Sequence, residues 1–524
     1  MNLASLAEQN LAEYGEYDRL LFEGKTFTNR DLNEASLRLA GGLVDLGCRP
    51  GDKVVLMMPN GPEAFVAYPA IWRAGLVVIP VLFVLEAREL AYIVVNSGAK
   101  IVITSPDVLP KVREALAMLP NETDPGALPA AVRVIVTGDD AQPGCISYET
   151  LVRSSRPLGE IVPREGSDIA TILYTSGTTG QPKGVVQTHR NLHANALNAR
   201  NSATMRDRGE SVLLVLPLAH TFGLSVLVSG YLFGSRGVLM RRFDPEQALA
   251  LIEQHKITYM AGVPTMFVLM TMLPNADRYD TSSVKRWLVG AAPMPMAQLR
   301  AFEAKFGGAM YVGYGLSEAS PSVASERDDF PRKPGSTGKP LAGVHVKIVD
   351  DDGRDVPRGT IGEICARGEN ISPGYYENPG ATAEMFRDGW LFTGDMGYLD
   401  EDGYLFVVER KKDLIIRGGL NVYPKDVEEV IHRHPDVLEV AVVGVPDLRM
   451  GEEVCAYVVP RAGAAVTRDE IVVHCQSNLA KYKTPRYVEF VSDLPKTSLG
   501  KIQKKEIRKW AAIRFGATDV RDAT

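Results

Sequence analysis

A loop of hydroxyl groups, glycines and one lysine in the middle of the chain is the segment best suited to chemistry. It follows an apolar, β-branched run at 169–174 and reads Thr175, Ser176, Gly177, Thr178, Thr179, Gly180, Gln181, Pro182, Lys183 and Gly184. Glycines let backbone N–H groups approach an anion closely, hydroxyl groups add hydrogen-bond donors, and the lysine adds positive charge. The pattern therefore predicts a polyphosphate-binding loop that follows a buried strand.

This loop differs from the phosphate loop of P-loop NTPases. That loop needs a glycine, four residues and then Gly-Lys-Ser/Thr, whereas Gln181 and Pro182 separate Gly180 from Lys183 here. Pro182 also argues against a helix that starts at the lysine. Taken alone, the segment could instead be a Gly/Thr-rich surface turn, which is the less favoured interpretation.

Five later segments place polar or small residues after apolar runs. The first, 216–224, contains His220, which alone is more often a structural residue than a catalyst. The second consists of Gly290, Ala291, Ala292 and Pro293. Such small residues let a flat ring lie against the backbone, although a plain strand-to-helix turn explains them equally well.

The remaining three segments carry charged or aromatic side chains. In 313–318, Tyr314 can stack on a purine, Ser317 can donate to a phosphate, and Glu318 can hold Mg²⁺, which prefers carboxylate and phosphate oxygen. In 389–395, Asp395 can accept hydrogen bonds from two adjacent ribose hydroxyls. In 495–502, Lys501 follows a glycine, where it would usually be an ordinary surface lysine.

The six segments together, in this order over roughly 170–505, resemble the adenylate-forming superfamily. That superfamily contains acyl-CoA synthetases, peptide-synthetase adenylation domains and firefly-type luciferases. The resemblance implies ATP, Mg²⁺ and coenzyme A as ligands. It assigns adenine packing to 290–293 with Tyr314 and Gly315, the ribose to Asp395 with Arg410, and Mg²⁺ to Glu318.

Further roles also come from the resemblance alone. His220 borders the substrate carboxylate, and Ser317 stands where the family usually has threonine, so its hydroxyl is kept. Lys501 matches the lysine that bridges the carboxylate and the α-phosphate. Lys412 matches the hinge of a mobile C-terminal unit, in which Gly418 and Gly419 border the pantetheine tunnel.

The implied reaction has two steps. A carboxylic acid attacks the α-phosphorus of ATP to give an acyl-adenylate and pyrophosphate; the C-terminal unit then turns, and coenzyme A displaces AMP. One alternative is an adenylation domain that loads a carrier protein, but residues 221–226 contain no acidic side chain to hold an amino group, and we expect no carrier module after residue 524. A non-catalytic acyl or nucleotide sensor is a second alternative. No residue argues for a luciferase-like oxygenation.

The acid is less well defined than the reaction. Positions that resemble the pocket of plant coumarate ligases are Phe222, Val226, Gly290, Gly313, Pro321 and Ser322. Because they are mostly apolar and carry no charge, they favour a neutral tail over dicarboxylates and amino acids. A medium- or long-chain fatty acid is the first expectation, with an aryl or alicyclic acid as the alternative. Whether Val226 blocks the pocket stays open.

Composition excludes several other classes of protein. The 524 residues are 45% hydrophobic and 23% charged, and the net charge of −6 gives no bulk attraction to nucleic acid or anionic membranes. Five scattered cysteines, with no C-x-x-C pair, argue against a disulfide framework or a zinc site. No signal peptide is expected, and the longest apolar run, 76–85, is too short to span a bilayer. We expect a cytoplasmic protein, and a homodimer is an oligomeric state that the sequence leaves open.

The elements that must position these residues follow from periodicity. Strands are predicted at 54–57, 76–81, 101–104, 212–216, 257–262, 287–290 and 310–312, and helices at 62–74, 87–96, 245–255 and 296–306. This alternation predicts an α/β fold with doubly wound, mostly parallel sheets. The Pro/Gly-rich stretch 121–145 is expected to be a surface loop.

The pattern changes after about residue 335. Short strands at 344–349, 362–367 and 404–409, separated by Asp-Gly turns, predict a small antiparallel β-subdomain over about 335–410. Residues 411–524 predict a mobile α+β domain after an N-terminal domain of 1–410. It has helices at 424–432 and 467–479, the second capped by Thr467 with Glu470, and strands at 440–445 and 454–459. The basic run Lys501, Lys504, Lys505, Arg508 and Lys509 is expected to be a solvated helix face.

Overall fold

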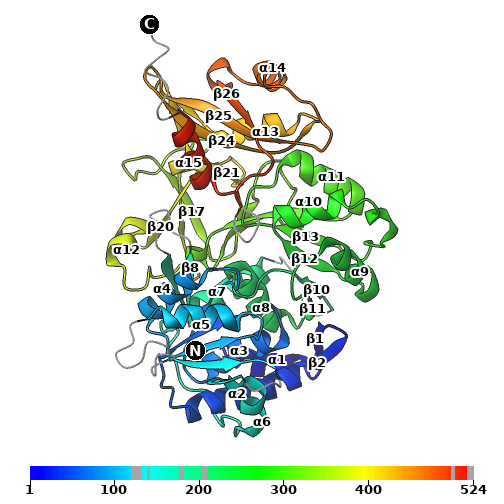
Figure 1. Ribbon diagram of the computed structural model, residues 1–524, viewed down its shortest axis with the longest axis vertical. Coiled ribbons are helices and arrows are strands. Elements are labelled where there is room, and N and C mark those ends of the chain that lie inside the picture. Colours follow the sequence, from blue (N-terminus) through cyan, green and yellow to red (C-terminus); the bar gives the residue numbers. More distant parts are fainter. Residues whose placement is uncertain (120–131, 139–141, 176–181, 203–208, 497–501, 516–524) are drawn as a thin grey trace.

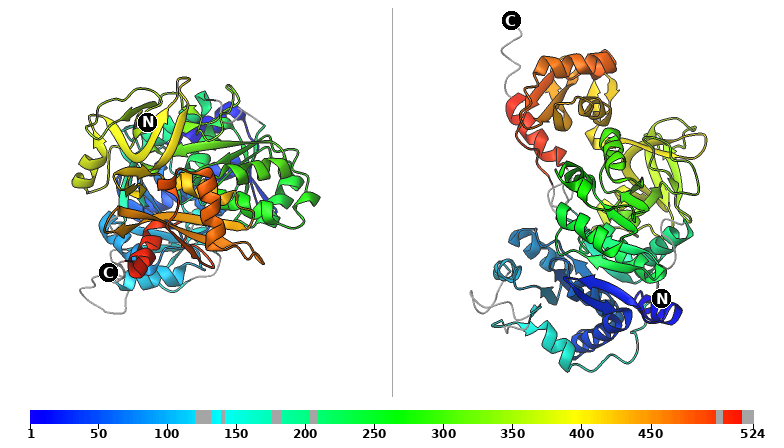
Figure 2. Two further views of the ribbon diagram at one scale, coloured as in Figure 1. Left: turned by 90° about the horizontal axis from the view of Figure 1, so that it is seen from above. Right: turned by 90° about the vertical axis from the view of Figure 1, so that its right-hand side faces the viewer.

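The computed structural model describes residues 1–119, 132–138, 142–175, 182–202, 209–496 and 502–515. The parts of the chain are stacked along the long axis of the molecule, with the N-terminal part at one end and the C-terminal unit at the other (Figure 1 and Figure 2). The described residues form four β-sheets in the mixed α/β architecture that the sequence predicts. Among them, no helix combines the length and apolar character needed to cross a membrane.

The largest sheet has nine strands and presents much of the predicted site. Its central strands are parallel, and antiparallel strands close both edges. The order is β16-β15-β14-β13-β12-β10-β11-β1-β2. The strands are β1 Asp18–Phe22, β2 Lys25–Thr28, β10 Ser211–Leu214, β11 Arg236–Leu239, β12 Tyr259–Gly262, β13 Arg286–Val289, β14 Ala309–Gly315, β15 Ser322–Ser325 and β16 Lys339–Pro340.

A second sheet has seven strands in the order β7-β6-β5-β3-β4-β8-β9, and only β9 is antiparallel to its neighbour. The strands are β3 Lys53–Met57, β4 Val77–Pro80, β5 Ile101–Thr104, β6 Arg133–Val136, β7 Ile146–Ser147, β8 Ile169–Thr175 and β9 Lys183–Thr188. Strand β6 corrects the expectation of a surface loop at 121–145. Its buried run Val134 to Val136 pairs with β5, because a short apolar run can satisfy its backbone in a sheet.

Helices cover the second sheet on both faces. Alternate residues of β3 enter two different cores, with Val54 and Leu56 in one and Val55 and Met57 in the other. This alternation confirms the doubly wound arrangement. The helices that accompany the two large sheets are α1 Ser5–Tyr14, α2 Asn29–Asp45, α3 Pro62–Arg73, α4 Ala87–Ser97, α5 Leu109–Ala117, α6 Tyr148–Ser154, α7 His189–Asn201, α8 Thr221–Phe233, α9 Pro245–His255, α10 Pro264–Met272 and α11 Met296–Phe306.

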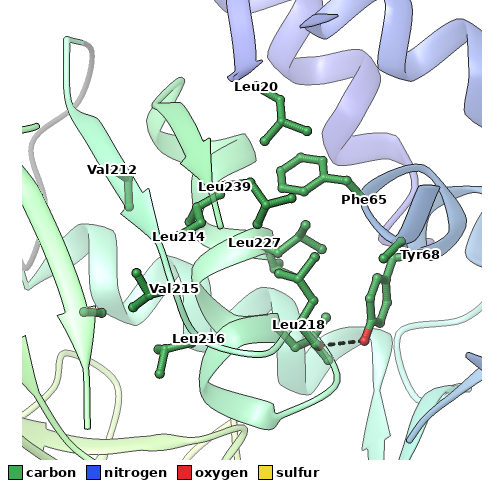
Figure 3. Close-up of a cluster of buried hydrophobic side chains, with 14 of the residues drawn as sticks. Leu20, Phe65, Tyr68, Val212, Leu214, Val215, Leu216, Leu218, Leu227 and Leu239 are labelled. Carbon is green, nitrogen blue, oxygen red and sulfur yellow. Dashed lines mark hydrogen bonds between the residues drawn. The ribbon is translucent and has the colours of Figure 1, made fainter. Parts of the chain in front are cut away.

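Helix α3 joins the two large sheets through one shared core. Figure 3 shows Phe65 and Tyr68 of α3 against Leu20 of β1 and Leu227 of α8. The Tyr68 hydroxyl donates to the carbonyl oxygen of Leu218 at 2.7 Å. Since residue 218 lies just before His220, this buried hydrogen bond fixes the segment that leads into the predicted site.

Asn60 holds the same segment from the second sheet. Its side-chain amide donates to the carbonyl oxygens of Leu216 and Met240 at 3.0 and 3.1 Å and accepts from the Leu218 N–H at 2.9 Å. These bonds explain why β10 ends at Leu214 rather than at the predicted residue 216. The backbone beyond β10 bonds to a side chain and not to a neighbouring strand.

The later part of the chain is largely antiparallel, as its Asp-Gly turns predict. One sheet comprises β17 His345–Val349, β18 Gly362–Arg367, β19 Phe386–Arg387, β20 Trp390–Leu399 and β21 Leu405–Arg410, with helix α12 Pro379–Met385. The last sheet comprises β22 Ile415–Arg417, β23 Leu420–Val422, β24 Val437–Asp447, β25 Gly451–Pro460 and β26 Tyr487–Phe490, with helices α13 Pro424–His432, α14 Arg468–Asn478 and α15 Lys504–Phe515. Single 3₁₀ turns are η1 Ala276–Arg278, η2 Ser317–Ala319, η3 Lys411–Asp413 and η4 Lys481–Lys483.

Helix bounds agree with the sequence better than strand bounds do. Helices α9, α11 and α13 begin and end at the predicted residues, and Thr467 forms the predicted capping box with Glu470. Strands β24 and β25 are longer than predicted at both ends, because they extend each other's ladder over Val437–Asp447 and Gly451–Pro460. The β1–β2 edge of the nine-stranded sheet was not predicted.

Gly223, in the first turn of α8, provides a test of how the segment before His220 is packed. An added Cβ would lie 2.1 Å from the carbonyl oxygen of Pro217, a backbone atom that cannot move aside. We expect Gly223→Ala to lower the free energy of unfolding by about 1–3 kcal/mol through this overlap, measured by calorimetry. Gly380→Ala, in the first turn of α12 with no atom within 4 Å of its added Cβ, is the control. Equal stability of the two variants would contradict the packing argument.

Candidate functional site

One cleft gathers most of the predicted site residues. It has a volume of about 2260 Å³ and is lined by the nine-stranded sheet, the antiparallel sheet and helices α13 and α15 of the C-terminal unit. The predicted residues that line it are Thr175, Lys183, His220, Phe222, Val226, Gly290, Ala291, Ala292, Pro293, Gly313, Tyr314, Gly315, Ser317, Glu318, Pro321, Ser322, Asp395, Arg410 and Lys412. Segments up to 237 residues apart in sequence, from 175 to 412, therefore meet at one place.

Two groups of predicted residues do not join this set. Ser176, Gly177, Thr178, Thr179, Gly180 and Lys501 lie outside the described residues. The turn glycines Gly418 and Gly419 are described, but they connect β22 to β23 with positive φ angles and are not among the residues that line the cleft.

The residues that flank the two undescribed segments, 176–181 and 497–501, lie at the cleft. Thr175 at the end of β8 pairs with Lys183 at the start of β9, and both line it. As Pro182 indicates, a strand and not a helix begins at Lys183. On the C-terminal side, Lys496 and Ile502 form an isolated antiparallel bridge and also line the cleft.

The Asp395 carboxylate is fixed from two sides. The Tyr314 hydroxyl donates to one of its oxygens at 2.7 Å, and the Arg410 Nε lies 2.7 Å from the other. Its strand β20 pairs with β21 so that Asp395 lies opposite Arg410. Burial, together with the neighbouring Asp395 charge, raises the pKa of Tyr314 well above its usual range. The arrangement presents an oriented carboxylate with further lone pairs that can accept hydrogen bonds.

Glu318 is the second oriented carboxylate. The Tyr375 hydroxyl donates to its Oε1 at 2.7 Å, and the Lys183 ammonium lies 5.3 Å from the centre of the Tyr375 ring. Burial raises the pKa of Tyr375, with the Glu318 charge as a further cause. Tyr375 was not predicted, because it lies in a turn-rich segment without periodicity and contacts Glu318 only through the fold.

Gln187 was also missed. Its side-chain N–H groups donate to the Thr221 hydroxyl and to the Ser317 carbonyl oxygen, both at 3.1 Å. It therefore connects the start of α8 to the turn that carries Glu318. In the sequence, only its position in β9, four residues after Lys183, indicates that Gln187 lies near the site.

A cation could be held at Glu318 only with help from a ligand. In the part of the chain that the structure describes, no group of three or more His, Cys, Asp or Glu side chains could hold a metal ion. Mg²⁺ commonly binds through one or two carboxylates and the phosphate oxygens of a nucleotide. Glu318, with one oxygen held by Tyr375, fits that kind of site.

The first part of α8 forms one wall of the cleft. The His220 side chain caps the helix, since its Nδ1 accepts from the Phe222 N–H at 3.2 Å. Phe222, Ser225, Val226 and Ser229 all line the cleft, so its wall continues one helical turn beyond Val226. Val226 therefore does not mark the end of the pocket.

Gly290 leaves a narrow slot beside this wall. A Cβ added there would lie 3.3 Å from the Phe222 ring and 3.5 Å from the Gly313 carbonyl oxygen. Any side chain at position 290 would therefore occupy the space between β13, β14 and α8. The slot suits a thin or flat group.

Ion pairs connect the C-terminal unit to the segment before Lys412. The Lys504 ammonium lies 2.9 Å from Glu428 and 3.4 Å from Glu409, and Arg508 pairs with Asp413. The Lys425 N–H also donates to the Glu409 carboxylate at 3.0 Å. Burial raises the pKa of Glu409. We call Glu409, Glu428 and Lys504 the hinge cluster.

The hinge cluster corrects the expectation for the basic run near the C-terminus. The Lys504 side chain is only 16% exposed, and Arg508, one turn later, faces the same way toward η3. Lys505 and Lys509 are exposed, as predicted. Helix α15 therefore presents one cationic face to the protein and another to solvent, a division that the tertiary contacts decide.

Comparison with known proteins agrees with this geometry. Residues 7–376 match the family model described as AMP-binding enzyme, and residues 426–501 match the model described as AMP-binding enzyme C-terminal domain. The chain is 34% identical over 527 residues to a long-chain-fatty-acid–CoA ligase of Bacillus subtilis (strain 168), covering 96% of this chain and 94% of that protein. It is 37% identical over 495 residues to a feruloyl-CoA synthase of Amycolatopsis sp, covering 94% and 95%. The solved structure of ATP-bound MatB from Rhodopseudomonas palustris has a TM-score of 0.87 at 32% identity, covering 97% of this chain and 99% of that one.

The hinge cluster gives a direct test of what stabilises the C-terminal unit. Lys504→Met would leave the Glu409 and Glu428 carboxylates without their shared cation, and we expect the free energy of unfolding to fall by about 3 kcal/mol. Chemical unfolding followed by circular dichroism measures the change. Lys509→Met removes an exposed ion pair with Glu506 and should change stability by less than about 1 kcal/mol. A Lys504→Met protein as stable as the Lys509→Met control would show that the cluster contributes nothing.

Proposed function

The chain belongs to the AMP-binding enzyme family and is an ATP-dependent, AMP-forming acyl-CoA ligase, and from this premise we propose that it activates a neutral carboxylic acid with a largely apolar tail. The observation that carries the proposal is the meeting, in one cleft, of a phosphate-loop pair, two oriented carboxylates and an uncharged slot. The loop pair and the two carboxylates suit a magnesium nucleotide. The slot suits the tail of the acid.

The nucleotide occupies the polar side of the cleft. Asp395, held by Tyr314 and Arg410, accepts from the ribose hydroxyls, and the adenine lies beside Gly290 to Pro293. In this proposal the triphosphate binds to the loop 175–184, and the Ser317 hydroxyl and the Lys501 ammonium act on the α-phosphate. When Mg²⁺ is bound at Glu318, it neutralises phosphate charge.

Adenylation joins two anions, so charge compensation is the main requirement. A carboxylate oxygen of the acid, beside His220, bonds to the α-phosphorus while the bond to pyrophosphate breaks. Lys501 and Lys183 supply positive charge where negative charge gathers, in a site that the domains shield from water. The product is an acyl-adenylate. In the second step the sulfur of coenzyme A bonds to the acyl carbon, its thiol proton is lost, and AMP leaves.

The second step needs a different face of the C-terminal unit. Gly418 and Gly419 lie outside the cleft lining, although the resemblance assigns them to the pantetheine tunnel. We propose that residues 411–524 turn about Lys412 relative to residues 1–410 and bring this turn to the acyl-adenylate. The turn would separate Glu409 from Lys504, so the hinge cluster holds the arrangement described here.

The acid's tail fits two descriptions. A medium- or long-chain fatty tail remains the first candidate, supported by a cleft that continues past Val226 and by the name of the Bacillus relative. An aryl tail is the second, supported by the slot between Gly290 and Phe222 and by the name of the feruloyl-CoA synthase. The pocket residues Phe222, Val226, Gly290, Gly313, Pro321 and Ser322 carry no charge, which disfavours dicarboxylates and amino acids.

A panel of acids tests the substrate proposal. We expect kcat/KM for decanoate, palmitate or cinnamate to exceed that for succinate or leucine by about tenfold or more, because a second charge would be buried without a partner. AMP release in the presence of coenzyme A measures each rate. Preference for a dicarboxylate or an amino acid would refute the neutral-tail proposal while leaving the reaction class intact.

Lys501→Ala tests the adenylation role. Removing the ammonium that we assign to the α-phosphate should slow acid-dependent ATP–pyrophosphate exchange by about 100-fold or more. Thioester formation from supplied acyl-adenylate should be much less affected, since that step uses another face of the unit. Lys509→Ala, which changes an exposed lysine of the same basic run, is the control. Exchange near the wild-type rate in Lys501→Ala would refute the assignment.

A further inference from the structure

The cleft wall formed by α8 changes character along its length. Phe222, Ser225, Val226 and Ser229 stand three and four residues apart and so share one helix face. From Phe222 to Ser229 this face extends about 10 Å along the helix axis. It begins with an aromatic ring beside His220 and carries two hydroxyl groups, at Ser225 and Ser229, on either side of the apolar Val226.

The first of these hydroxyls is oriented by a buried amide. The Asn195 side chain on α7, only 1% exposed, donates to the Ser225 hydroxyl oxygen at 2.8 Å. The Asn195 carbonyl oxygen accepts from the Ser322 N–H at 3.1 Å, which fixes the direction of the amide. Ser225 therefore receives a hydrogen bond and keeps its own hydrogen to donate.

Other helical serines in this chain use that hydrogen within their helix. Ser97 donates to the Ile93 carbonyl oxygen at 2.6 Å, and Ser477 donates to that of Val473 at 2.9 Å. No such acceptor is found for Ser225 among the described residues. Its hydrogen is available to a group in the cleft.

Ser229 is the second hydroxyl. It is only 4% exposed, lies one turn beyond Ser225 and lines the cleft. Within the described segments, its hydroxyl has no hydrogen-bond partner. A hydroxyl that lines a cleft is hydrated until a ligand covers it, and it then needs a polar partner in place of the lost water. Ser225, with a hydrogen left to donate, and Ser229 stand on one wall of the cleft, where a polar atom of a bound ligand would supply that partner.

We propose that Ser225, oriented by Asn195, and Ser229 bind an oxygen atom at the far end of the acyl tail. The inference rests on the proposed function and narrows its substrate to an acid whose apolar tail carries a hydroxyl, ether or carbonyl oxygen about 10 Å beyond the Phe222 end of α8. A ring with an oxygen substituent para to the acyl chain and a medium chain with a terminal hydroxyl both present that chemistry.

The pocket selects such a tail because a tail without the oxygen leaves the Ser225 and Ser229 hydroxyls without a hydrogen-bond acceptor. The wall residues Phe222, Ser225, Val226 and Ser229 carry no charge, so the recognised group is a neutral oxygen. A plain alkyl or phenyl end would occupy the same space and leave both hydroxyls dehydrated without an acceptor. Sites built to hydrogen-bond a substrate group discriminate strongly against the analogue that lacks it.

Binding of matched analogues tests the proposal without requiring turnover. The probes are non-hydrolysable acyl-sulfamoyl adenosines in two pairs, 4-hydroxycinnamoyl with cinnamoyl and 10-hydroxydecanoyl with decanoyl. We expect the wild-type protein to bind the oxygen-bearing member of at least one pair about tenfold more tightly by calorimetry. The pair that shows the preference identifies the tail scaffold.

The double variant Ser225→Ala/Ser229→Ala should reduce that ratio of Kd values to about one. Asn195→Leu, which leaves Ser225 unoriented, should reduce it in part. Ser97→Ala makes the same change at a buried helical serine that does not line the cleft and should keep the wild-type ratio. Equal binding of both members of each pair by the wild-type protein, or a ratio unchanged in the double variant, would overturn the proposal.

These outcomes are distinct from failure of the proposed function. Acyl-CoA formation from the four parent acids reports the reaction, whereas the Kd ratios report recognition of the tail. A protein that binds the analogues with the expected ratio but forms no thioester would refute the proposed reaction alone. A protein that forms thioesters with no preference for oxygen would refute this inference alone.

Discussion

The fixed Asp395 carboxylate is the interaction on which the arrangement of the cleft depends. Tyr314 reaches it from β14 of the nine-stranded sheet, and Arg410 reaches it from β21 of the antiparallel sheet. One carboxylate therefore joins two layers that the chain connects only through a long intervening segment. Because Lys412 follows Arg410 by two residues, the same contact anchors the near side of the proposed hinge.

The contacts at the proposed hinge stabilise the C-terminal unit and would also have to break when it turns. The hinge cluster and the Lys425 contacts hold the C-terminal unit against the last strand of the preceding sheet. A buried cation shared by two carboxylates stabilises the arrangement in which the three groups are in contact. This stabilisation is lost when the groups separate. The proposed reaction requires such a separation between its two steps, so the cluster sets part of the free-energy difference between the two arrangements.

The acyl side of the cleft is defined by its shape and not by charged contacts. The absence of side chains at Gly290 and Gly313, together with the Phe222 ring, defines its shape, and these three residues carry no charge. Shape of this kind accepts many thin tails. Specificity then depends on a few polar atoms, of which the Asn195, Ser225 and Ser229 group is the one that the fold places at the far end.

The sequence by itself determined the local structure and the chemical types of the site. Helices α9, α11 and α13 were predicted to the residue, because amphipathic periodicity and terminal proline or cap residues are local signals. The order of six segments identified the family and named many, though not all, of the described residues that line the cleft. Only the tertiary structure decided which groups hold them: Tyr375 contacts Glu318 across 57 residues, Asn195 contacts Ser225 across 30, and Lys504 contacts Glu409 across 95. Such pairs leave no periodic trace in a sequence, since each is created by the packing of elements whose separation along the chain is arbitrary. The burial of Lys504 within a basic run and the early end of β10 at Leu214 have the same origin, because in both cases a partner distant in sequence determines the local outcome.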